Sequence, residues 1–432
     1  MILVSIRGAQ KSERLIKAPS ESKTHQTKMK KILIILTFLG LFTTLHAQDV
    51  KNQLNPIYHG VTSLAIAPDA RAAGLGDVGA ATDPDVNSQY WNPAKYPFCI
   101  SRAGISLNYT PWLRQLVDGI DLANITGYYR LGDYDALSSS LRYFSLGEVT
   151  LADDENVSFK PYELSVDLAY SRMLSETFSA GVALRYIYSD LAYKGDDETS
   201  PGSAFAADIA LYHNGYLNLG GHESQLGWGL NISNIGSKIS YDSGNTSEFI
   251  PTNMRFGLSL LVPFDEYNTL SISADANKLL VPTRPTMDQY VKHMVSTEGG
   301  EAKDYEKDYG GYRTWLEGEG YFNVSPINGI FKSFHDAPNG FKEEMQEIQW
   351  SVGLEYAYNN QFFLRAGYHY EHPNKGNRTY YTVGAGFKMN VFSLDAVYVI
   401  STAQSNPLDQ TLRFSLAFDM DGINDLLGKR RR

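Results

Sequence analysis

The chain has 432 residues, with 38 Lys and Arg against 48 Asp and Glu, and a formal net charge of −10. This acidic balance argues against nucleic-acid binding, because nucleic acids are drawn to basic patches. The one cysteine, Cys99, allows neither an internal disulfide nor a CxxC metal or redox motif. After residue 45 no apolar run approaches the about 20 residues of a transmembrane helix, so any membrane crossing must use a closed β-barrel.

The amino-terminal region has the features of an export signal. Lys30 and Lys31 precede the apolar stretch 32–45, and the small residue Ala47 follows it, so residues 29–47 are predicted to be a secretory signal peptide. Residues 1–28 have no apolar core and are interpreted as an upstream extension outside the native fold. Residues 1–47 carry eight basic and two acidic side chains, so their removal leaves 30 basic and 46 acidic residues, a net charge of −16.

The next segment, 48–103, is rich in Ala and Gly and lacks the alternation of a strand. It precedes a long region of predicted barrel strands, so we expect it to fill the barrel lumen as a plug. The stretch Gly74 to Gly79 spells G-x-G-x-x-G, a dinucleotide fingerprint that requires a preceding buried strand. Pro68 disfavours such a strand, so we interpret these glycines as sites of close packing between the plug and the barrel wall.

Residues 104–420 break into segments of roughly ten residues with alternating polarity. For example, Leu164, Val166 and Leu168 share one strand face, whereas Ser165 and Asp167 share the other. The pattern predicts an all-β fold, a transmembrane antiparallel barrel of about 14 strands. The predicted strands lie near residues 104–109, 120–131, 135–146, 163–174, 177–190, 203–216, 225–234, 254–264, 268–279, 347–358, 361–371, 380–389, 391–400 and 411–419.

A soluble sandwich would show the same alternation, but two further features favour a membrane barrel. Tyrosines cluster near strand ends on the apolar face, as interfacial girdles do, at Tyr186, Tyr188, Tyr356, Tyr358, Tyr368 and Tyr370. The connections alternate between short turns and long loops, the longest being 280–346. An even strand number would leave both termini in the periplasm and the long loops outside the cell. The first strand and the link 217–224 are weakly patterned, so 12 or 16 strands stay open. Residues 421–432 are expected to be a periplasmic tail.

Charged residues on the polar strand faces are expected to point into the lumen. There they would pair with one another and with the plug, and the alternative is a pathway for a solute. The set comprises Asp167, Arg185, Asp208, Asp275, Glu355, Arg365, Lys388, Asp395 and Arg413.

No motif in the sequence indicates a catalytic function. The acidic runs 153–155 and 196–198 lack the spacing of an EF-hand and are interpreted as solvated loops rather than cation sites. The histidines are scattered without an H-E-x-x-H pattern, and no G-x-S-x-G motif occurs. We therefore predict no catalytic residues, no metal site and no cofactor.

Five stretches of the chain carry a further signal. They are 69–77, which reads DARAAGLGD, then 87–95 (NSQYWNPAK), 331–341 (FKSFHDAPNGF), 375–380 (KGNRTY) and 406–418 (NPLDQTLRFSLAF). These five stretches resemble the PorV family, the outer-membrane barrels of the Bacteroidetes type IX secretion system. The first two contain the residues that we single out as a plug motif, Gly74, Gly76, Trp91, Asn92 and Pro93.

The resemblance implies a fourteen-stranded barrel similar to the fatty-acid transporter FadL, located in the outer membrane. It also implies that the protein collects cargo, by the carboxy-terminal β-domain of the cargo, from the large translocon barrel of the SprA or Sov type. The cargo would then pass to a surface sortase complex for attachment to lipopolysaccharide. Two alternatives stay open: a FadL-type transporter of hydrophobic small molecules, and a lipopolysaccharide O-deacylase or deacylation accessory, which would need a Ser–His pair at the membrane-facing rim.

The long loop 280–346 is the candidate partner-binding region, because loops on a rigid scaffold commonly carry recognition. Its aromatic density suits a protein-binding surface, although the loop could equally fold back over the barrel mouth. The candidate residues are Tyr305, Tyr309, Tyr312, Trp315, Tyr321, Phe322, Phe331, Phe334 and Phe341.

Overall fold

The structure, a computed structural model, describes residues 55–112, 119–150, 158–191, 199–242, 246–402 and 411–426. The predicted signal peptide, the upstream extension and both acidic runs lie outside these described residues. Within the described part of the chain, no helix is long and apolar enough to span a membrane.

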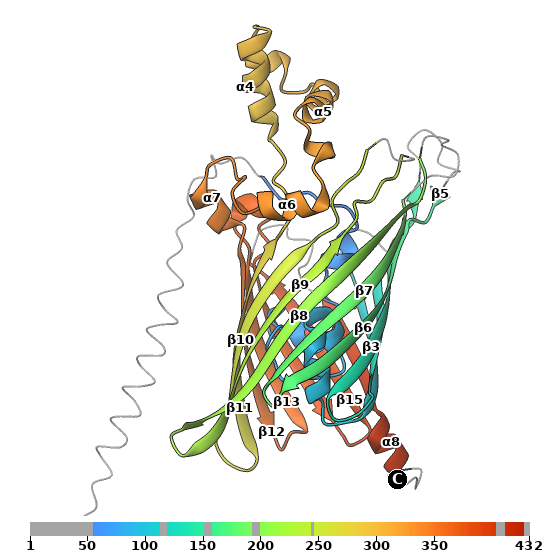
Figure 1. Cartoon of the computed structure of the whole chain (residues 1–432), viewed down its shortest axis with the longest axis vertical. Coiled ribbons are helices and arrows are strands. Elements are labelled where there is room, and N and C mark those ends of the chain that lie inside the picture. The colour runs from blue at the N-terminus through green and yellow to red at the C-terminus, as the bar shows by residue number, and fades with distance from the viewer. Residues whose placement is uncertain are drawn as a thin grey trace, which may run out of the picture. The chain divides into compact units, whose positions relative to one another are not determined.

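Fourteen of the described strands form a closed antiparallel barrel (Figure 1). Each strand pairs with its neighbour in the chain, and the first pairs with the last, with Ile105 opposite Phe418. Closure leaves no unpaired edge, which is the condition for strands to cross a bilayer. The strands are β1 (Ala103–Pro111), β2 (Ile120–Arg130), β3 (Asp135–Leu146), β6 (Tyr162–Ser175), β7 (Phe178–Asp190), β8 (Gly202–Leu219), β9 (His222–Gly236), β10 (Asn253–Pro263), β11 (Asn268–Leu279), β12 (Gln349–Tyr358), β13 (Phe362–Tyr370), β14 (Tyr380–Lys388), β15 (Phe392–Ser401) and β16 (Leu412–Asp419).

The predicted alternation is confirmed, with the polar faces turned inward. On β6, Val166 and Leu168 are exposed on the outer surface, whereas Ser165 and Asp167 are buried. A soluble protein would bury the apolar face, so this inversion is typical of a barrel surrounded by lipid. The closed sheet of fourteen strands also confirms the predicted strand number.

The two ends of the barrel differ in their connections. At one end, here called the short-turn end, strands are joined by 131–134, 176–177, 220–221, 264–267, 359–361 and 389–391. At the other end, here called the long-loop end, the connections are longer, and the longest comprises the 69 residues 280–348. One of these long connections carries the small sheet of β4 (Val149–Thr150) and β5 (Ser158–Phe159). The predicted link 217–224 is wrong, because β8 and β9 extend through it and meet at the tight Gly220–Gly221 turn, where both glycines have positive φ.

Outward-facing tyrosines gather near both ends of the barrel. Tyr129 and Tyr358 lie near the short-turn end, and Tyr109 and Tyr381 near the long-loop end, all with exposed side chains. Rings with an apolar body and a polar hydroxyl favour the two membrane interfaces. The arrangement therefore brackets a band of lipid-facing side chains between two aromatic girdles.

The plug, residues 55–102, lies inside the barrel, where its short helices are visible behind the strands in Figure 1. It is small and helical rather than extended, and it packs apolar side chains against the inner wall in separate clusters. One of these joins Val61 and Leu64 of the plug to Ile187 and Ile239. The plug helices are η1 (Thr62–Ala65), α2 (Ala70–Ala73), α3 (Ser88–Trp91) and η2 (Pro93–Phe98).

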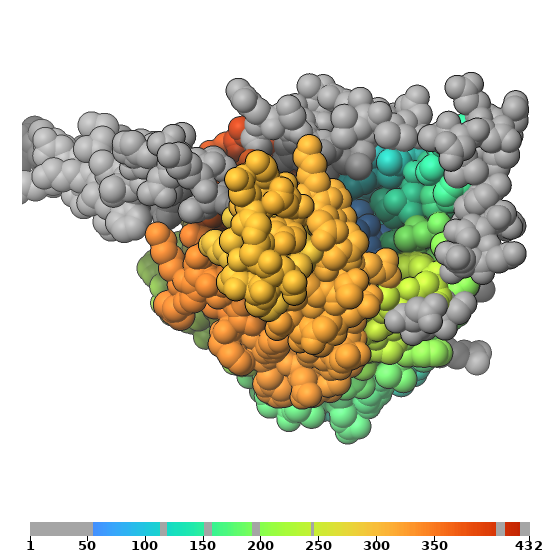
Figure 2. Space-filling view, turned by 90° about the horizontal axis from the view of Figure 1, so that it is seen from above, coloured from blue at the N-terminus to red at the C-terminus, as the bar shows by residue number. Residues whose placement is uncertain are grey.

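The long connection 280–348, here called the helical insert, is not an irregular loop. Two helices rise away from the barrel and two lie across its rim (Figure 1). Seen from above, the insert lies over one part of the long-loop end, beside plug residues in blue (Figure 2). Its elements are α4 (Met287–Thr297), η3 (Ala302–Asp304), α5 (Tyr309–Gly318), η4 (Tyr321–Asn323), α6 (Pro326–Lys332) and α7 (Phe341–Gln346). The other short helices are η5 (Pro373–Lys375) and α8 (Met420–Leu426), and α8 begins one residue before the predicted tail.

The outer face of β7 gives a direct test of lipid contact. Leu184 lies midway along this strand with 71% of its side chain exposed. We expect Leu184→Arg to reduce the free energy of unfolding by about 2–4 kcal/mol, because it places a charge near the bilayer midplane. Urea unfolding in lipid vesicles, followed by gel mobility, measures the change. Leu184→Phe is the matched control, and an unchanged Leu184→Arg variant would contradict lipid contact at this face.

Candidate functional site

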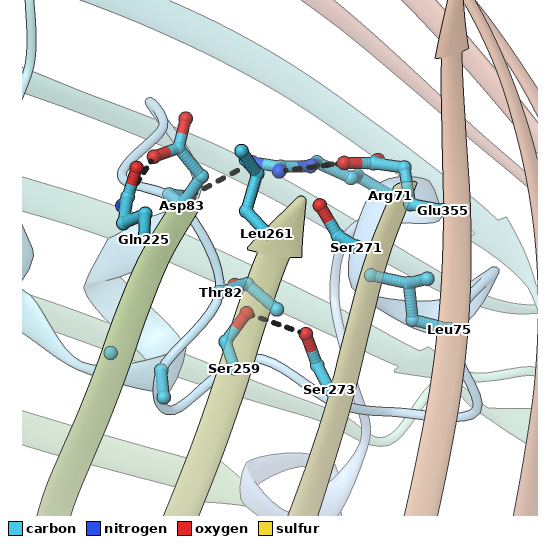
Figure 3. A pocket seen from close by; sticks show the side chains of 12 residues that line it. Arg71, Leu75, Thr82, Asp83, Gln225, Ser259, Leu261, Ser271, Ser273 and Glu355 are labelled. Atoms are coloured by element: carbon cyan, nitrogen blue, oxygen red, sulfur yellow. Dashed lines mark hydrogen bonds and ion pairs between the residues drawn. The ribbon is translucent and has the colours of Figure 1, made fainter. Parts of the chain in front are cut away.

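The plug is fixed to the barrel wall by a buried charge network centred on Glu355. Arg71 of α2 contacts Glu355 of β12 through its Nη2 atom at 3.1 Å and Asp85 through its Nη1 atom at 2.7 Å. Arg365 of β13 shares the same carboxylate through its Nε atom and reaches Asp395 through Nη1 at 2.6 Å. Figure 3 shows Arg71 extending across the wall to Glu355. The network joins three strands to the plug.

A second set of contacts holds the glycine-rich part of the plug. The Asp77 carboxylate accepts a hydrogen bond from the Tyr380 hydroxyl at 2.6 Å and pairs with Arg413 at 3.2 Å. Asp275 Oδ2 accepts the backbone N–H groups of Gly79 at 2.8 Å and Ala80 at 3.0 Å. Carboxylates that accept backbone N–H groups stabilise a segment without regular structure, because they satisfy its free donors.

Within the wall itself, Arg185 bridges two carboxylates. It lies 3.2 Å from Asp167 and 2.9 Å from Asp208, and all three side chains are buried. Most of the lumenal charges predicted from the sequence are thus brought together in ion pairs, with two exceptions. Asp275 instead accepts backbone N–H groups of the plug. Lys388 is exposed at the end of β14, because the strand ends there and its side chain leaves the lumen.

The plug-motif residues are buried at the plug core. The Trp91 indole N–H donates to Asp69 Oδ1, and Asp69 Oδ2 in turn accepts the Ala72 N–H at the start of α2. Asn92 caps η2 through the Ala94 N–H and donates to the carbonyls of Ala80 and Leu211. Pro93 occupies the first turn of η2, where a missing N–H is harmless. These residues build the plug and fasten it to β8.

Gly76 shows why the glycine stretch cannot carry side chains. Its φ is +73°, and a Cβ placed there would lie 2.6 Å from the backbone nitrogen of Tyr368. The facing Gly367 is equally constrained, because its Cβ would lie 2.0 Å from the Gly76 nitrogen. Gly74 ends α2 and lies against the Arg365 side chain. The spacing that imitates a dinucleotide fingerprint therefore serves contact between the plug and β13.

Sequence reasoning missed several lumenal residues. Arg142 and Arg255 lie on the inward faces of β3 and β10, so the alternation that selected Asp167 could have found both. Lys95 of the plug had no periodic signal. It is buried and donates to the Gly79 carbonyl at 3.0 Å and the Thr82 hydroxyl at 3.1 Å.

A Ser–His pair is also present in the lumen. Ser351 Oγ lies 2.9 Å from His369 Nδ1, and both side chains are buried on the inner wall. A lipopolysaccharide deacylase would need such a pair at the membrane-facing rim, in reach of an acyl chain. This pair does not meet that requirement.

The helical insert contains all of the predicted partner-binding aromatics, and the structure divides them into two groups. In the first, Tyr312 and Trp315 of α5 pack around the buried Tyr290 of α4, with ring centroids 5.8 and 5.6 Å from the Tyr290 ring. Tyr321 is buried against Phe249 and Phe322. Tyr305 donates its hydroxyl to the Gly299 carbonyl. These residues hold the insert together rather than present a surface.

The second group is exposed. Phe331, Phe334 and Phe341 expose 67, 46 and 79% of their surface, and Tyr309 exposes 71%. Ile327 and Met345 on α6 and α7 are exposed as well. An exposed apolar row on two rim helices is a candidate docking surface, because monomeric proteins seldom leave large apolar patches in water.

The insert is fastened to the barrel by a buried group of five charged residues, here called the latch. Lys278 at the end of β11 contacts Glu344 Oε2 at 3.1 Å and Glu347 Oε2 at 2.5 Å. Lys375 of η5 contacts Glu343 Oε1 at 2.6 Å and Glu347 Oε1 at 3.1 Å. The latch therefore connects the carboxy-terminal end of the insert to two different parts of the long-loop end.

Neighbouring residues extend the latch to the plug and to the start of the insert. Asn55 of the plug donates to Glu343 Oε1 at 3.1 Å. Thr283 donates its hydroxyl to Glu347 Oε1 and its backbone N–H to Asp336 Oδ2, both at 3.0 Å. Both ends of the insert thus meet at one polar cluster, so its rim helices are held rigidly.

Two carboxyl groups of this cluster have shifted pKa values in opposite directions. Burial raises the pKa of Asp336 to about 6. For Glu343, burial also acts to raise the pKa, but hydrogen bonds from Lys375 and Asn55 outweigh it and hold the pKa below its usual range. Lowering the pH toward 6 therefore adds a proton to Asp336 before Glu343 is affected.

Comparison with known proteins identifies the family of this chain. Residues 48–286, more than half of the chain, match the family model of the type IX secretion system protein PorV. The chain belongs to the PorV family. The resemblance noted in the sequence is therefore confirmed. The matched region covers the plug and β1 to β11 and ends at the start of the insert, before α6 and α7.

Solved structures that are similar to this chain include two toluene transporters and a FadL homologue. The Ralstonia pickettii toluene transporter TbuX is 10% identical, with 81% of this chain and 97% of that chain covered and a TM-score of 0.42. A Pseudomonas aeruginosa FadL homologue is 12% identical (84% and 99% covered, TM-score 0.40). The Pseudomonas putida toluene transporter TodX is 11% identical (85% and 98% covered, TM-score 0.42). Comparison with curated protein sequences gives no match. The fourteen-stranded barrel itself is defined by its strand pairing.

The Glu355 network predicts how firmly the plug is held. We expect Glu355→Gln to lower the free energy of unfolding by about 3–5 kcal/mol, because it removes one partner from two buried arginines. Chemical unfolding of the refolded protein measures this change. Asp83→Asn is the matched control, since Asp83 is exposed and, among the described side chains, bonds only to Gln225. Equal stability of the two variants would show that the plug does not depend on Glu355.

The Asp336 shift predicts a pH dependence of the docking of α7. The usual pKa is 3.8 and the folded value about 6, so the docked state binds the proton more tightly between these values. The free energy of opening α7 should therefore decrease as the pH rises from 4 to 6, with the contribution fully present below the usual pKa. Amide exchange of residues 341–347 at fixed intrinsic rate measures it. Asp336→Asn should flatten the profile, and an unchanged slope in that variant would contradict the assignment.

Proposed function

We propose that this PorV-family barrel is a non-enzymatic shuttle of the type IX secretion system. It would bind cargo by the carboxy-terminal β-domain of the cargo, take it from the translocon barrel, and pass it to the surface attachment complex. The match of residues 48–286 to the family is the observation that carries this proposal. The exposed apolar row of the helical insert supports it locally.

The proposed orientation places the short-turn end in the periplasm and the helical insert at the cell surface. Both barrel ends, at Gly104 and Asp419, are paired with each other at the short-turn end. A chain exported by the predicted signal peptide arrives from the periplasm, and outer-membrane barrels keep their short turns on that side. The insert then faces the side on which attachment to lipopolysaccharide takes place.

The rim helices suit partner recognition for two reasons. Phe331 and Phe341 are exposed although large aromatic side chains favour burial, and aromatic residues dominate binding energy at interfaces. The latch fixes α7 to the barrel, so docking would cost little conformational entropy. A rigid apolar row is therefore available to a folded β-domain.

The transporter alternative requires a continuous apolar path past the plug. The lumen beside the plug is instead crossed by the ion pairs Arg71–Glu355 and Arg413–Asp77. The cavity drawn in Figure 3, between the plug and β9 to β12, has a volume of about 10 Å³, whereas two larger cavities beside the plug, of about 60 and 320 Å³, lie toward the long-loop end. This packing supports a shuttle over a conduit.

The double variant Phe331→Ser/Phe341→Ser tests the docking surface. We expect surface-attached cargo to decrease several-fold, because hot-spot aromatics each contribute about 2 kcal/mol or more, while the barrel stays folded because both side chains are exposed. Fractionation of cells with quantification of one cargo protein measures attachment. Ile100→Ser is the matched control, since Ile100 is 93% exposed but lies at the short-turn end.

Normal attachment in the double variant would exclude these two residues from cargo docking. A pull-down from solubilised outer membrane tests the partners independently. Recovery of a very large barrel together with cargo β-domains would support the shuttle. Recovery of the barrel with bound fatty acid and no protein partner would contradict it.

A further inference from the structure

An exposed arginine lies on the outer wall at the short-turn end, where α8 leaves the barrel. Arg102 directly precedes β1, and its guanidinium carbon lies 5.2 Å from the centre of the Tyr129 ring. Tyr129 belongs to the aromatic girdle near this end, with 46% of its surface exposed. Girdle tyrosines lie at the level of the lipid head groups. Arg102 is therefore placed at the depth of the lipid phosphates.

The first turn of α8 is tied to the same place by backbone contacts. Asp421 Oδ2 accepts the backbone N–H of Arg102 at 2.9 Å. Asp419 Oδ1 accepts the N–H groups of Asp421 at 2.9 Å and Gly422 at 3.2 Å, which satisfies free donors at the start of the helix. Gly422 lies against the β14–β15 turn, where a Cβ would be 1.9 Å from the Asn390 carbonyl oxygen. The two carboxylates beside Arg102 thus hold α8 at the girdle, and Figure 1 shows the helix directed away from the barrel.

The outer wall beside α8 is aromatic and apolar. The Phe387 ring lies 5.1 Å from that of Phe362 and 6.4 Å from that of Phe392, measured between ring centroids. These three rings, here called the phenylalanine cluster, belong to the ends of β13, β14 and β15 at the short-turn end. Met389 of the adjoining turn and Met420 of α8 are 50 and 37% exposed. Apolar side chains in this position favour the boundary between acyl chains and head groups, so we expect α8 to lie at the membrane surface.

The charges of the short-turn end are divided unevenly around the barrel. The turns 359–361 and 389–391, on the side of α8, contain no acidic residue, whereas the turns between β2 and β3, β6 and β7, and β10 and β11 each contain at least one. Lys388, at the end of β14, is exposed on the side of α8. An anion that approaches α8 from β12 to β15 therefore meets positive charge without repulsion from a turn carboxylate.

The sequence that follows α8 adds a run of positive charge at this side. Residues 429–432 read Lys-Arg-Arg-Arg, and only two residues separate this basic run from Leu426, where α8 ends. The predicted mature chain has 30 basic residues and a net charge of −16, so four consecutive cations are a local departure from its acidic balance. The basic run thus follows a helix whose start is fixed beside Arg102.

We propose that Arg102, α8 and the basic run 429–432 form a binding surface for anionic phospholipids of the leaflet at the short-turn end. The phosphate groups would lie against the cations, and the acyl chains against Tyr129 and the phenylalanine cluster. A basic segment next to a membrane attracts anionic lipid in this way, because each cation interacts with the surface within about a Debye length. This surface goes beyond the shuttle function. Only its assignment to the periplasmic leaflet rests on the proposed orientation.

Native mass spectrometry of the full barrel in detergent measures its affinity for single lipids. The probes are dioleoyl phosphatidylglycerol, which is anionic, and dioleoyl phosphatidylethanolamine, which has the same acyl chains but no net charge. We expect the anionic lipid to bind at least about tenfold more tightly. The variant Lys429→Gln/Arg430→Gln/Arg431→Gln/Arg432→Gln should lose this preference. Arg102→Gln should weaken binding of phosphatidylglycerol about fivefold, whereas Arg102→Lys should keep it, because the charge remains.

Two controls test whether the position of the cations matters. Lys160→Gln/Lys292→Gln/Lys303→Gln/Lys307→Gln removes the same number of positive charges from exposed positions at the long-loop end, so the preference for phosphatidylglycerol should stay unchanged. Arg172→Gln changes an exposed arginine near the short-turn end that is already paired with a carboxylate, and it should also leave the preference unchanged.

A fluorescent label on α8 locates the bound lipid. The label NBD, attached to Met420→Cys in a Cys99→Ser background, reports the polarity beside the helix, since Met420 is partly exposed. Its emission should shift to shorter wavelength when phosphatidylglycerol is added to phosphatidylcholine vesicles that contain the barrel. High salt should reverse the shift, because it screens the attraction between the cations and the lipid. The variant that lacks the basic run should show no shift.

Equal affinity for the two lipids, an unchanged preference without the basic run, or an equal loss in the long-loop control would each overturn the proposal. Unchanged binding in Arg102→Gln would exclude Arg102 and overturn the surface as proposed. Tighter binding of an acidic muropeptide than of phosphatidylglycerol would overturn it as well, because the cations would then recognise the cell wall. Lipid binding is measured without cargo, so its failure is distinguishable from a failure of the proposed shuttle, which is measured by surface attachment.

Discussion

Every feature of this protein depends on the requirement that strands in lipid leave no backbone group unpaired. Pairing β1 with β16 closes the barrel and meets this requirement. Closure forces the side chains to alternate between lipid and lumen, so the apolar residues are exposed and the polar residues are enclosed. A lumen lined with charges must then be filled by groups that pair with them. The plug does so, and Glu355 holds Arg71 of the plug and Arg365 of the wall at once.

The same closure separates a rigid wall from the parts that are free to meet partners. Short turns leave little surface at one end, whereas the other end carries the helical insert. The latch joins the insert to β11 and to the β13–β14 connection through Lys278 and Lys375. The proposed docking residues thus lie on helices that are fixed to the barrel, and binding by a fixed segment costs less conformational entropy than binding by a disordered one.

The strands could be predicted because each carries its own signal. Alternation along β6 or β12 depends only on neighbours in the chain, and predicted and observed bounds differ by few residues. The prediction of a loop at 217–224 was wrong because the Gly-rich, polar sequence of this segment resembles that of a loop, although β8 and β9 continue through it. The aromatic content of the insert did not predict its helices, because only capping residues indicate where a helix begins. The capping box of α4, formed by Thr286 and Gln289, is a sequence signal that indicates the start of this helix.

The sequence alone predicted the strands and the polarity of their two faces, because these follow from a local period of two residues. It predicted a barrel of about fourteen strands from the girdle tyrosines and the loop lengths, and strand pairing decided between fourteen and the alternatives of 12 or 16. It could not divide the aromatic residues of the insert into those that pack, such as Trp315, and those that stay exposed, such as Phe341. It could not show that Lys95 is enclosed or that Lys278 and Lys375 both reach Glu347. Those outcomes depend on which distant segments meet in the lumen and at the rim, and only tertiary structure decides that.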